Sequence, residues 1–101
     1  MSLDSILHQS AQYHAEDMAT QNYFDHTSLD GSSFAERVAR FGATNGYLGE
    51  NIAWGQKTPE AVMKARMNSP GHKANILNVN FTLLGVGFSE TGNYWVQNFG
   101  G

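Results

Sequence analysis

The spacing of apolar residues changes along this chain from a helical period to strict alternation, and that change limits the folds it can adopt. In residues 84–88 apolar side chains alternate with glycines, and residues 94–99 also alternate in character. A five-residue turn that contains glycine, 89–93, separates the two runs. This pattern predicts an antiparallel β-hairpin. A further short strand is expected at 49–54.

The first 68 residues carry most of the helical signals. Apolar residues three and four apart predict a helix from about Asp4, as N-cap, to Gln21. Ser33–Glu36 is a capping box that opens a second helix, and Thr58-Pro59-Glu60 is typical of the start of a third, which is expected to end near Asn68. Pro70-Gly71 should break that helix and leave one further turn at 72–78. This order predicts an α+β fold, with helices flanking a small antiparallel sheet.

Length and composition point to one globular domain. The chain has 101 residues, of which 41% are hydrophobic and 15% charged. The net charge of −3 and the lack of a basic stripe argue against a nucleic-acid partner. No apolar run approaches the length that crosses a membrane. A monomer is expected.

Cysteine is absent, which excludes disulfides, thiolate metal sites and a cysteine nucleophile. Met1-Ser2-Leu3 is typical of a start added for expression. We therefore expect the domain to span 4–101, with any natural leader removed.

Three polar residues beside turns are candidates for a site. His72 follows Pro70-Gly71, His26 ends the segment Tyr23–His26, and Glu50 follows Gly49. Two imidazoles suit zinc, copper or nickel better than calcium or magnesium. Glu50 could be a third ligand, or it could orient one imidazole from behind. In the alternative interpretation both histidines only hydrogen-bond loop carbonyls and hold the shape of the site.

Seven short segments, taken in order, resemble the CAP superfamily, which includes cysteine-rich secretory proteins, insect venom antigens, plant pathogenesis-related proteins and bacterial SCP-like extracellular proteins. The bacterial branch fits best, and the likeness covers about residues 8–100. The segments are Ala11–Ala15 with Met18-Ala19, Tyr23–His26, Asp30-Gly31 followed by Phe34 and Arg37, Gly49–Ala53, Ser69–His72 with Asn75–Leu77, Gly85–Gly87, and Tyr94–Phe99.

The resemblance implies an α-β-α sandwich with a central cleft that two histidines and two glutamates line. The histidines fall on His26 and His72 and one glutamate falls on Glu50. The second glutamate aligns with Ser69, so one carboxylate of the full set is absent. Arg66 stands where the family usually has tryptophan, and from the resemblance we expect the family's first helix to be missing before residue 4.

Other residues around this cleft have two interpretations each. Ser69 is expected to cap the turn around Pro70 or to hydrogen-bond near His72. Asn51 and Asn75 are expected to line the cleft and to satisfy backbone groups. The cations Lys64, Arg66 and Lys73 could face an anionic partner such as a cell-wall polymer, but such residues more often form a solvated face. His14 lies on the apolar face of the first helix and is expected at the edge of the core.

Three functions are compatible with the expected cleft. The first is a binding module of a bacterial extracellular or cell-wall-associated protein that holds a divalent metal, with zinc favoured, a small ligand or a cell-wall component. The second is a metal-assisted, peptidase-like hydrolase with Glu50 as its base. The third is a lipid or sterol carrier, although no long apolar groove is evident.

Overall fold

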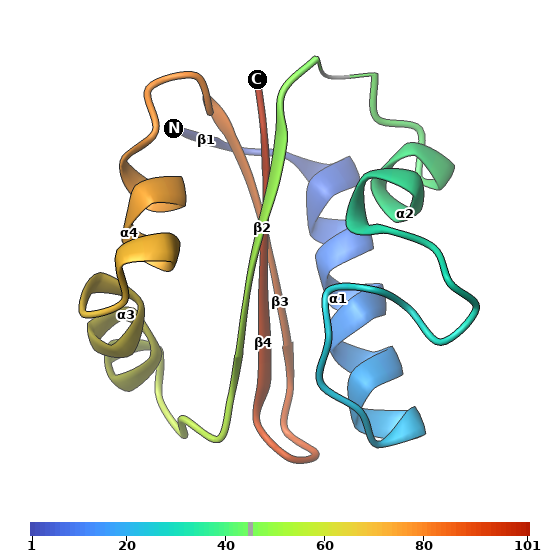
Figure 1. Cartoon of the computed structure of the whole chain (residues 1–101), viewed down its shortest axis with the longest axis vertical. Helices are drawn as coiled ribbons and strands as arrows, with labels where there is room; N and C mark the ends of the chain where they lie inside the picture. Colours follow the sequence, from blue (N-terminus) through green and yellow to red (C-terminus); the bar gives the residue numbers. More distant parts are fainter. Residues whose placement is uncertain (45) are drawn as a thin grey trace.

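The fold has three layers, with a β-sheet between two pairs of helices (Figure 1). The structure is a computed structural model that describes residues 1–44 and 46–101. Helices α1 and α2 cover one face of the sheet, and α3 and α4 cover the other. This arrangement confirms the α-β-α sandwich. The elements in chain order are β1 (Ser2–Leu3), α1 (Ser5–Gln21), α2 (Phe34–Arg40), β2 (Leu48–Trp54), α3 (Pro59–Met67), α4 (Pro70–Leu77), β3 (Leu83–Ser89) and β4 (Tyr94–Gly100).

The sheet has the strand order β1-β3-β4-β2. The hairpin β3–β4 is antiparallel as predicted, and β2 pairs antiparallel with β4 on its other side. One prediction was incomplete, because Ser2 and Leu3 form a short strand parallel to β3. The sheet is therefore mixed, and residues 2–3 belong to it. Backbone hydrogen bonds from Ser2 to Thr82 and from Asp4 to Leu84 hold this segment in place.

Helix α1 lies unusually close to β3. Asp4 caps the helix by accepting a hydrogen bond from the Leu7 amide, as predicted. Its buried face packs on the sheet directly over Gly85 and Gly87. A Cβ atom at Gly85 would lie 2.0 Å from the backbone carbon of Leu7, and one at Gly87 would lie 2.3 Å from that of Ala11. The alternating glycines of β3 therefore provide the space that the helix backbone occupies.

The shorter helices begin at the predicted signals. Both hydrogen bonds of the capping box between Ser33 and Glu36 are present at the start of α2. Thr58 caps α3 through its hydroxyl, and Pro59 occupies the first turn. The extent of α4 differs from the prediction, because Pro70 does not only end α3. It also starts an eight-residue helix, since proline needs no amide partner in a first turn.

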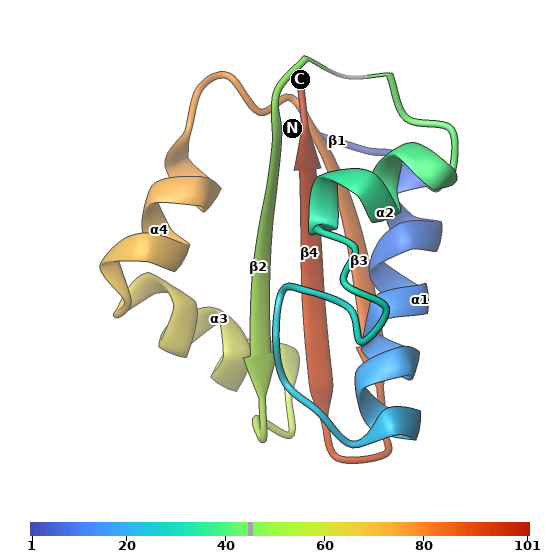
Figure 2. The same cartoon turned by 45° about the vertical axis from the view of Figure 1, so that its right-hand side comes forward.

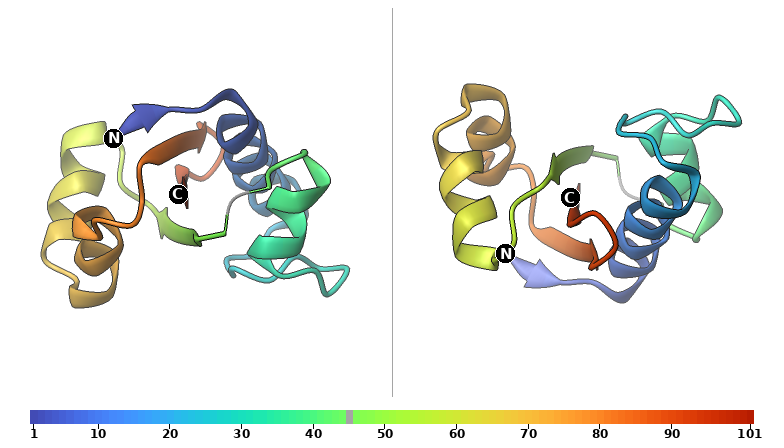
Figure 3. Two further views of the ribbon diagram at one scale, coloured as in Figure 1. Left: turned by 90° about the horizontal axis from the view of Figure 1, so that it is seen from above. Right: turned by 90° about the horizontal axis from the view of Figure 1, so that it is seen from below.

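Strand β2 is an edge of the sheet, and its position sets the location of the site. Figure 2 shows β2 with α3 and α4 on one side and the loop before α2 on the other. The views along the strands in Figure 3 show the same order of layers. Alternate residues of β2 therefore contact different layers. Among the described residues, no helix is both long and apolar enough to cross a membrane.

Candidate functional site

Glu50 is the centre of a buried polar network under the α1–α2 layer. The residue is 5% exposed, and its carboxylate receives hydrogen bonds from three side chains. Arg37 Nη1 donates to Oε2 at 2.5 Å, His26 Nδ1 to Oε1 at 2.9 Å and Asn98 Nδ2 to Oε2 at 2.8 Å. Ser10 in turn donates to the Asn98 side-chain oxygen. Both carboxylate oxygens are thus occupied within the fold.

The charge of Glu50 is stabilised despite its burial. Burial alone would raise its pKa, but hydrogen bonds from His26 and Arg37, together with the positive charge of Arg37, outweigh that effect. The net result is a pKa below the usual value of a glutamate. Glu50 therefore holds no proton near neutral pH and has little tendency to accept one.

Arg37 connects the carboxylate to the loop that carries His26. Its side chain is almost fully buried, and Nη2 donates to the backbone carbonyl of His26 at 2.7 Å. One guanidinium thus neutralises Glu50 and fixes the loop at the same time. The ion pair joins α2 to β2, and the backbone contact adds the segment between α1 and α2.

His26 is the accessible member of the network. Half of its side-chain surface is exposed, and its Nδ1 proton points to Glu50. The hydrogen bond from Nδ1 to Glu50 raises the pKa of His26, although partial burial opposes this. Its Nε2 has no hydrogen-bond partner among the residues that the structure describes. The ring lines an open hollow of about 530 Å³, together with Thr27, Ser33, Phe34, Leu48, Gly49, Glu50 and Asn75.

His72 and Asn75 cover the free edge of β2 from the α4 side. His72 Nε2 lies 3.0 Å from the Ile52 carbonyl oxygen, which can only accept, so Nε2 carries the proton. Its Nδ1 then accepts from the Ser69 hydroxyl at 2.9 Å. Asn75 donates to the Glu50 carbonyl at 3.2 Å. One helix face thus satisfies two carbonyls of an edge strand, which protects that edge from pairing with another chain.

The amides of this region form a second network on the α3–α4 side of β2. Asn51 donates to the His72 carbonyl and to the Gln97 side chain, both at 3.1 Å. Asn75 donates to Asn51 Oδ1 at 2.8 Å. The expectation that Asn75 satisfies backbone groups is thus confirmed. Ser69 stands at the N-cap of α4 without a side-chain cap, because its hydroxyl serves His72 instead.

The structure brings His26 and Glu50 together but places His72 differently. His72 forms no side-chain hydrogen bond or ion pair with either, and it lines another hollow with Ser69 and Arg66. Both its ring nitrogens are engaged, and Glu50 has no free oxygen. Among the described residues, no group of three or more histidine, aspartate or glutamate side chains is placed to hold a metal ion. In this arrangement the three residues do not fit a shared metal site, and metal binding stays a prediction.

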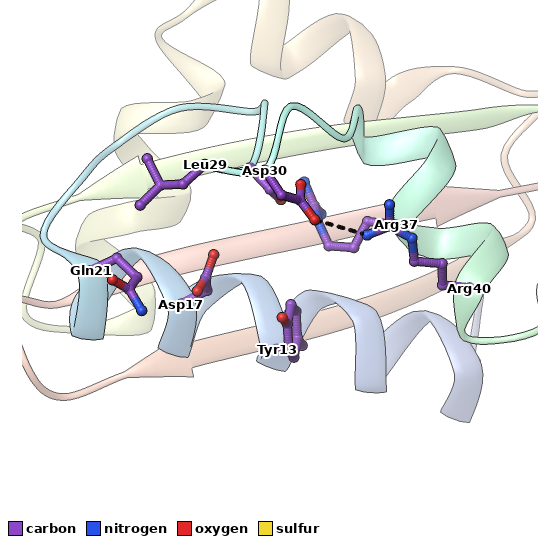
Figure 4. A pocket seen from close by; sticks show the side chains of 8 residues that line it. Tyr13, Asp17, Gln21, Leu29, Asp30, Arg37 and Arg40 are labelled. Carbon is purple, nitrogen blue, oxygen red and sulfur yellow. Dashed lines mark hydrogen bonds and ion pairs between the residues drawn. The ribbon is translucent and has the colours of Figure 1, made fainter.

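A third hollow lies between α1, α2 and the loop that joins them (Figure 4). Its volume is about 370 Å³, and Tyr13, Asp17 and Gln21 line it from α1. An exposed ion pair between Arg40 and Asp30 lies at its rim. Arg37 also lines this hollow, but its guanidinium is committed to Glu50.

Three functional positions were not evident from the sequence. Arg37 and Asn98 complete the Glu50 network. Arg66 is buried, although cations at such positions more often lie on a solvent-exposed face. The sequence held a signal for Arg37, because a buried carboxylate requires a cation and Arg37 neighbours the core residue Val38. For Arg66 the signal was its spacing, because it lies four residues after Val62 and shares that helix face, whereas Lys64 lies two residues after Val62 and is exposed.

His14 lies deeper than the core edge. It is fully buried on α1, and its Nε2 donates to the Asp25 carbonyl at 2.8 Å. Burial lowers the pKa of His14, and the nearby charge of Arg37 lowers it further. The neutral ring anchors the start of the His26 loop to α1, so its contribution is structural.

Comparison with known proteins agrees with this geometry. The model of the cysteine-rich secretory protein family, CAP, matches residues 1–99. The Bacillus subtilis protein YkwD, itself uncharacterised, is 50% identical over 99 residues, which are 98% of this chain and 38% of that protein. This chain therefore spans well under half of that relative's length.

Two solved structures share the fold. An extracellular protein of Bacillus anthracis that contains an SCP domain superposes with a TM-score of 0.94 at 34% identity, over 99% of this chain and 33% of that one. An outer surface protein of Borrelia burgdorferi gives a TM-score of 0.90 at 23% identity, over 99% of this chain and 76% of that one, which bears on the fold alone. The chain belongs to the cysteine-rich secretory protein (CAP) family.

Proposed function

We propose that this domain is a ligand-binding module of an extracellular bacterial protein, and that it is not a hydrolase. The extracellular location is supported by the Bacillus anthracis neighbour, which is described as an extracellular protein. The proposed binding position is the hollow that His26 lines at the free edge of β2.

The state of Glu50 carries this proposal. A general base must reach a substrate proton and have a pKa near the working pH. Glu50 is buried, has both oxygens occupied by three donors, and has a lowered pKa. Such a carboxylate is built to stay ionised and to orient its neighbours. Its role is to hold His26, which leaves His26 Nε2 as the group that meets a ligand.

The hollow suits a small ligand with polar and apolar parts. His26 supplies one ring nitrogen, and Thr27 and Ser33 carry hydroxyl groups. Phe34 and Leu48 supply an apolar wall. This mixture favours a small polar ligand over a lipid tail, which would need a continuous apolar lining.

A divalent cation is the second candidate, and the Glu50–His26 pair favours it. A carboxylate behind one imidazole nitrogen is a common way to orient the other nitrogen toward a metal. Zinc is the ion that imidazole ligands favour. A second imidazole would be available only if His72 gave up its hydrogen bonds to Ile52 and Ser69.

Nuclear magnetic resonance of the domain separates these functions. A fragment screen should shift the His26 ring and the amides of Leu48–Glu50, and the shifts should disappear in His26→Ala. Zinc titration by calorimetry, with His26→Ala and His72→Ala as controls, tests the cation. Turnover of a peptide or ester that is lost in Glu50→Gln, while that variant stays folded, would overturn the binding-module proposal.

A further inference from the structure

Arg66 is buried on α3 without a partner for its charge. Only 3% of the residue is exposed, and among the described residues no carboxylate forms an ion pair with it. Its Nε and Nη2 are buried and lack hydrogen-bond partners there. These two nitrogens form one edge of the guanidinium plane, the edge that accommodates a carboxylate through two parallel hydrogen bonds.

The lack of a partner has an energetic consequence. Burial lowers the pKa of Arg66 to about 10, with no neighbouring charge to offset it. A buried, unpaired cation destabilises a fold unless something outside the fold completes it. Lys64, on the same helix, is exposed and has no such deficit.

Arg66 lines a hollow that combines polar and aromatic walls. The hollow has a volume of about 250 Å³ and lies between α3, the start of α4 and the end of β2. Gln56 also lines it, and its Oε1 is a third buried atom there without a partner. Phe24 and Trp54 line it as well, with ring centroids 6.2 Å apart and both side chains substantially exposed. The lining of the hollow thus combines an unsatisfied cation with partly exposed rings.

We propose that this hollow binds the carboxylate of a small ligand that has an apolar body. Arg66 receives the carboxylate on its Nε–Nη2 edge, and the apolar body packs on Phe24 and Trp54. An N–H or O–H group of the ligand donates to Gln56 Oε1, which can only accept. The site is separate from the His26 hollow, so it goes beyond the function proposed above. Its occupant would supply the hydrogen bonds that the fold leaves unmade.

A carboxylate fits better than a phosphate because of its lower charge. The guanidinium edge can accept either anion through two parallel hydrogen bonds. A phosphate brings more negative charge into a hollow with a single cation and largely apolar walls, and desolvation of that charge is costly. Because Nε and Nη2 are shielded from water, entry requires a side chain that lines the hollow to rotate.

The test uses two probes that differ only in charge. N-acetyl-phenylalanine carries the carboxylate, and N-acetyl-phenylalaninamide replaces it with a neutral amide. Titration of the labelled domain should shift the Arg66 Nε–H resonance and the amides of Ala53–Gln56 with the acid. The amide should bind at least about tenfold more weakly, a loss that corresponds to about 1.4 kcal/mol.

Two variants and one further probe complete the test. Arg66→Met should remove binding of the acid, whereas Lys64→Met, which removes an exposed charge from the same helix, should leave it unchanged. A tetrapeptide that ends in phenylalanine should bind more tightly than the acid if the natural ligand is a peptide C-terminus, and no more tightly if it is a free acid. Absence of binding by the acid, equal binding of acid and amide, or retained binding in Arg66→Met would overturn the proposal. Shifts in the His26 hollow report on the other site independently.

Discussion

Replacement of Arg66 by methionine should stabilise the folded domain while it removes the proposed carboxylate site. Methionine has nearly the length of the arginine stem and fills the same volume without a charge. The wild-type residue is 3% exposed, and among the described residues its Nε and Nη2 have no partner, so the variant removes an unfavourable group and retains the packing of the stem. The predicted gain is the opposite of the usual effect of a buried substitution.

The size of the gain follows from the lowered pKa of Arg66. The fall of the Arg66 pKa from the ordinary arginine value to about 10 corresponds to roughly 3 kcal/mol at 1.36 kcal/mol per pH unit. That figure is an upper limit, because Nη1 is not among the buried, unpartnered atoms and keeps some contact with water. We expect a gain of about 1–3 kcal/mol, within the range for replacement of buried charges by apolar residues.

Urea unfolding monitored by tryptophan fluorescence measures this gain, since Trp95 is 6% exposed. With an m-value of about 1 kcal/mol/M, the midpoint should rise by about 1–3 M. The gain should be constant from pH 5 to 9, where Arg66 is charged in both states. It should shrink above pH 10, because the folded wild type then loses the proton before the unfolded chain does.

Lys64→Met is the matched control and should change stability by no more than about 0.5 kcal/mol, because Lys64 is exposed. An Arg66→Met variant that is destabilised by about 1 kcal/mol or more would show that the guanidinium is satisfied within the fold. The account of an unpaired charge would then be wrong.

Three further predictions concern the core and the Glu50 network. Gly85→Ala should destabilise the domain by about 3 kcal/mol or more in thermal melts, because its Cβ would meet the Leu7 backbone. The control Gly71→Ala places its Cβ in open space and should change the stability by less than about 1 kcal/mol. Equal effects of the two variants would contradict the close packing of α1 on β3. Glu50→Gln should lower the free energy of unfolding, measured in urea, by about 3–5 kcal/mol, because Arg37 is left buried and unpaired. Arg37→Met in the Glu50→Gln background should recover part of that loss. If it recovers none, the ion pair is not the cause of the loss. Because the pKa of His26 is raised, its ion pair with Glu50 stabilises the fold fully below about pH 6.5 and is lost as pH rises through the raised value. The wild type should therefore be more stable at pH 5.5 than at pH 8.5 relative to His26→Gln, by at most about 1 kcal/mol because the ring is half exposed. A wild type that gains stability relative to His26→Gln as pH rises would exclude the pair.

Much of the secondary structure could be predicted because its signals are local. The capping box at Ser33–Glu36, the Thr58-Pro59 start and the Asp4 cap each act within one helical turn. The hairpin of β3 and β4 follows from alternation over a few residues. The two-residue β1 was missed, because a strand this short exists only through its pairing with Leu83 and Leu84.

The sequence indicates that His26 and His72 lie beside turns, but the roles of these residues depend on contacts with residues far away in the chain. Only the folded chain shows that His26 donates to Glu50 while His72 donates to a carbonyl of β2. Asn98 and Glu50 are 48 residues apart and meet because β2 and β4 pair in register.

Burial separates what the sequence determined from what the tertiary structure decided. The spacing within residues 59–67 places Arg66 on the helix face of Val62 and Lys64 on another face, so the sequence could indicate which cation turns inward. Whether the inward cation meets a carboxylate depends on how α3 packs against the rest of the domain, and among the described residues Arg66 meets none. The sequence by itself determined most of the elements and indicated the family, but not β1 or the full extent of α4. The tertiary structure decided which charges are paired, because desolvation is a property of the packed interior and has no local signature.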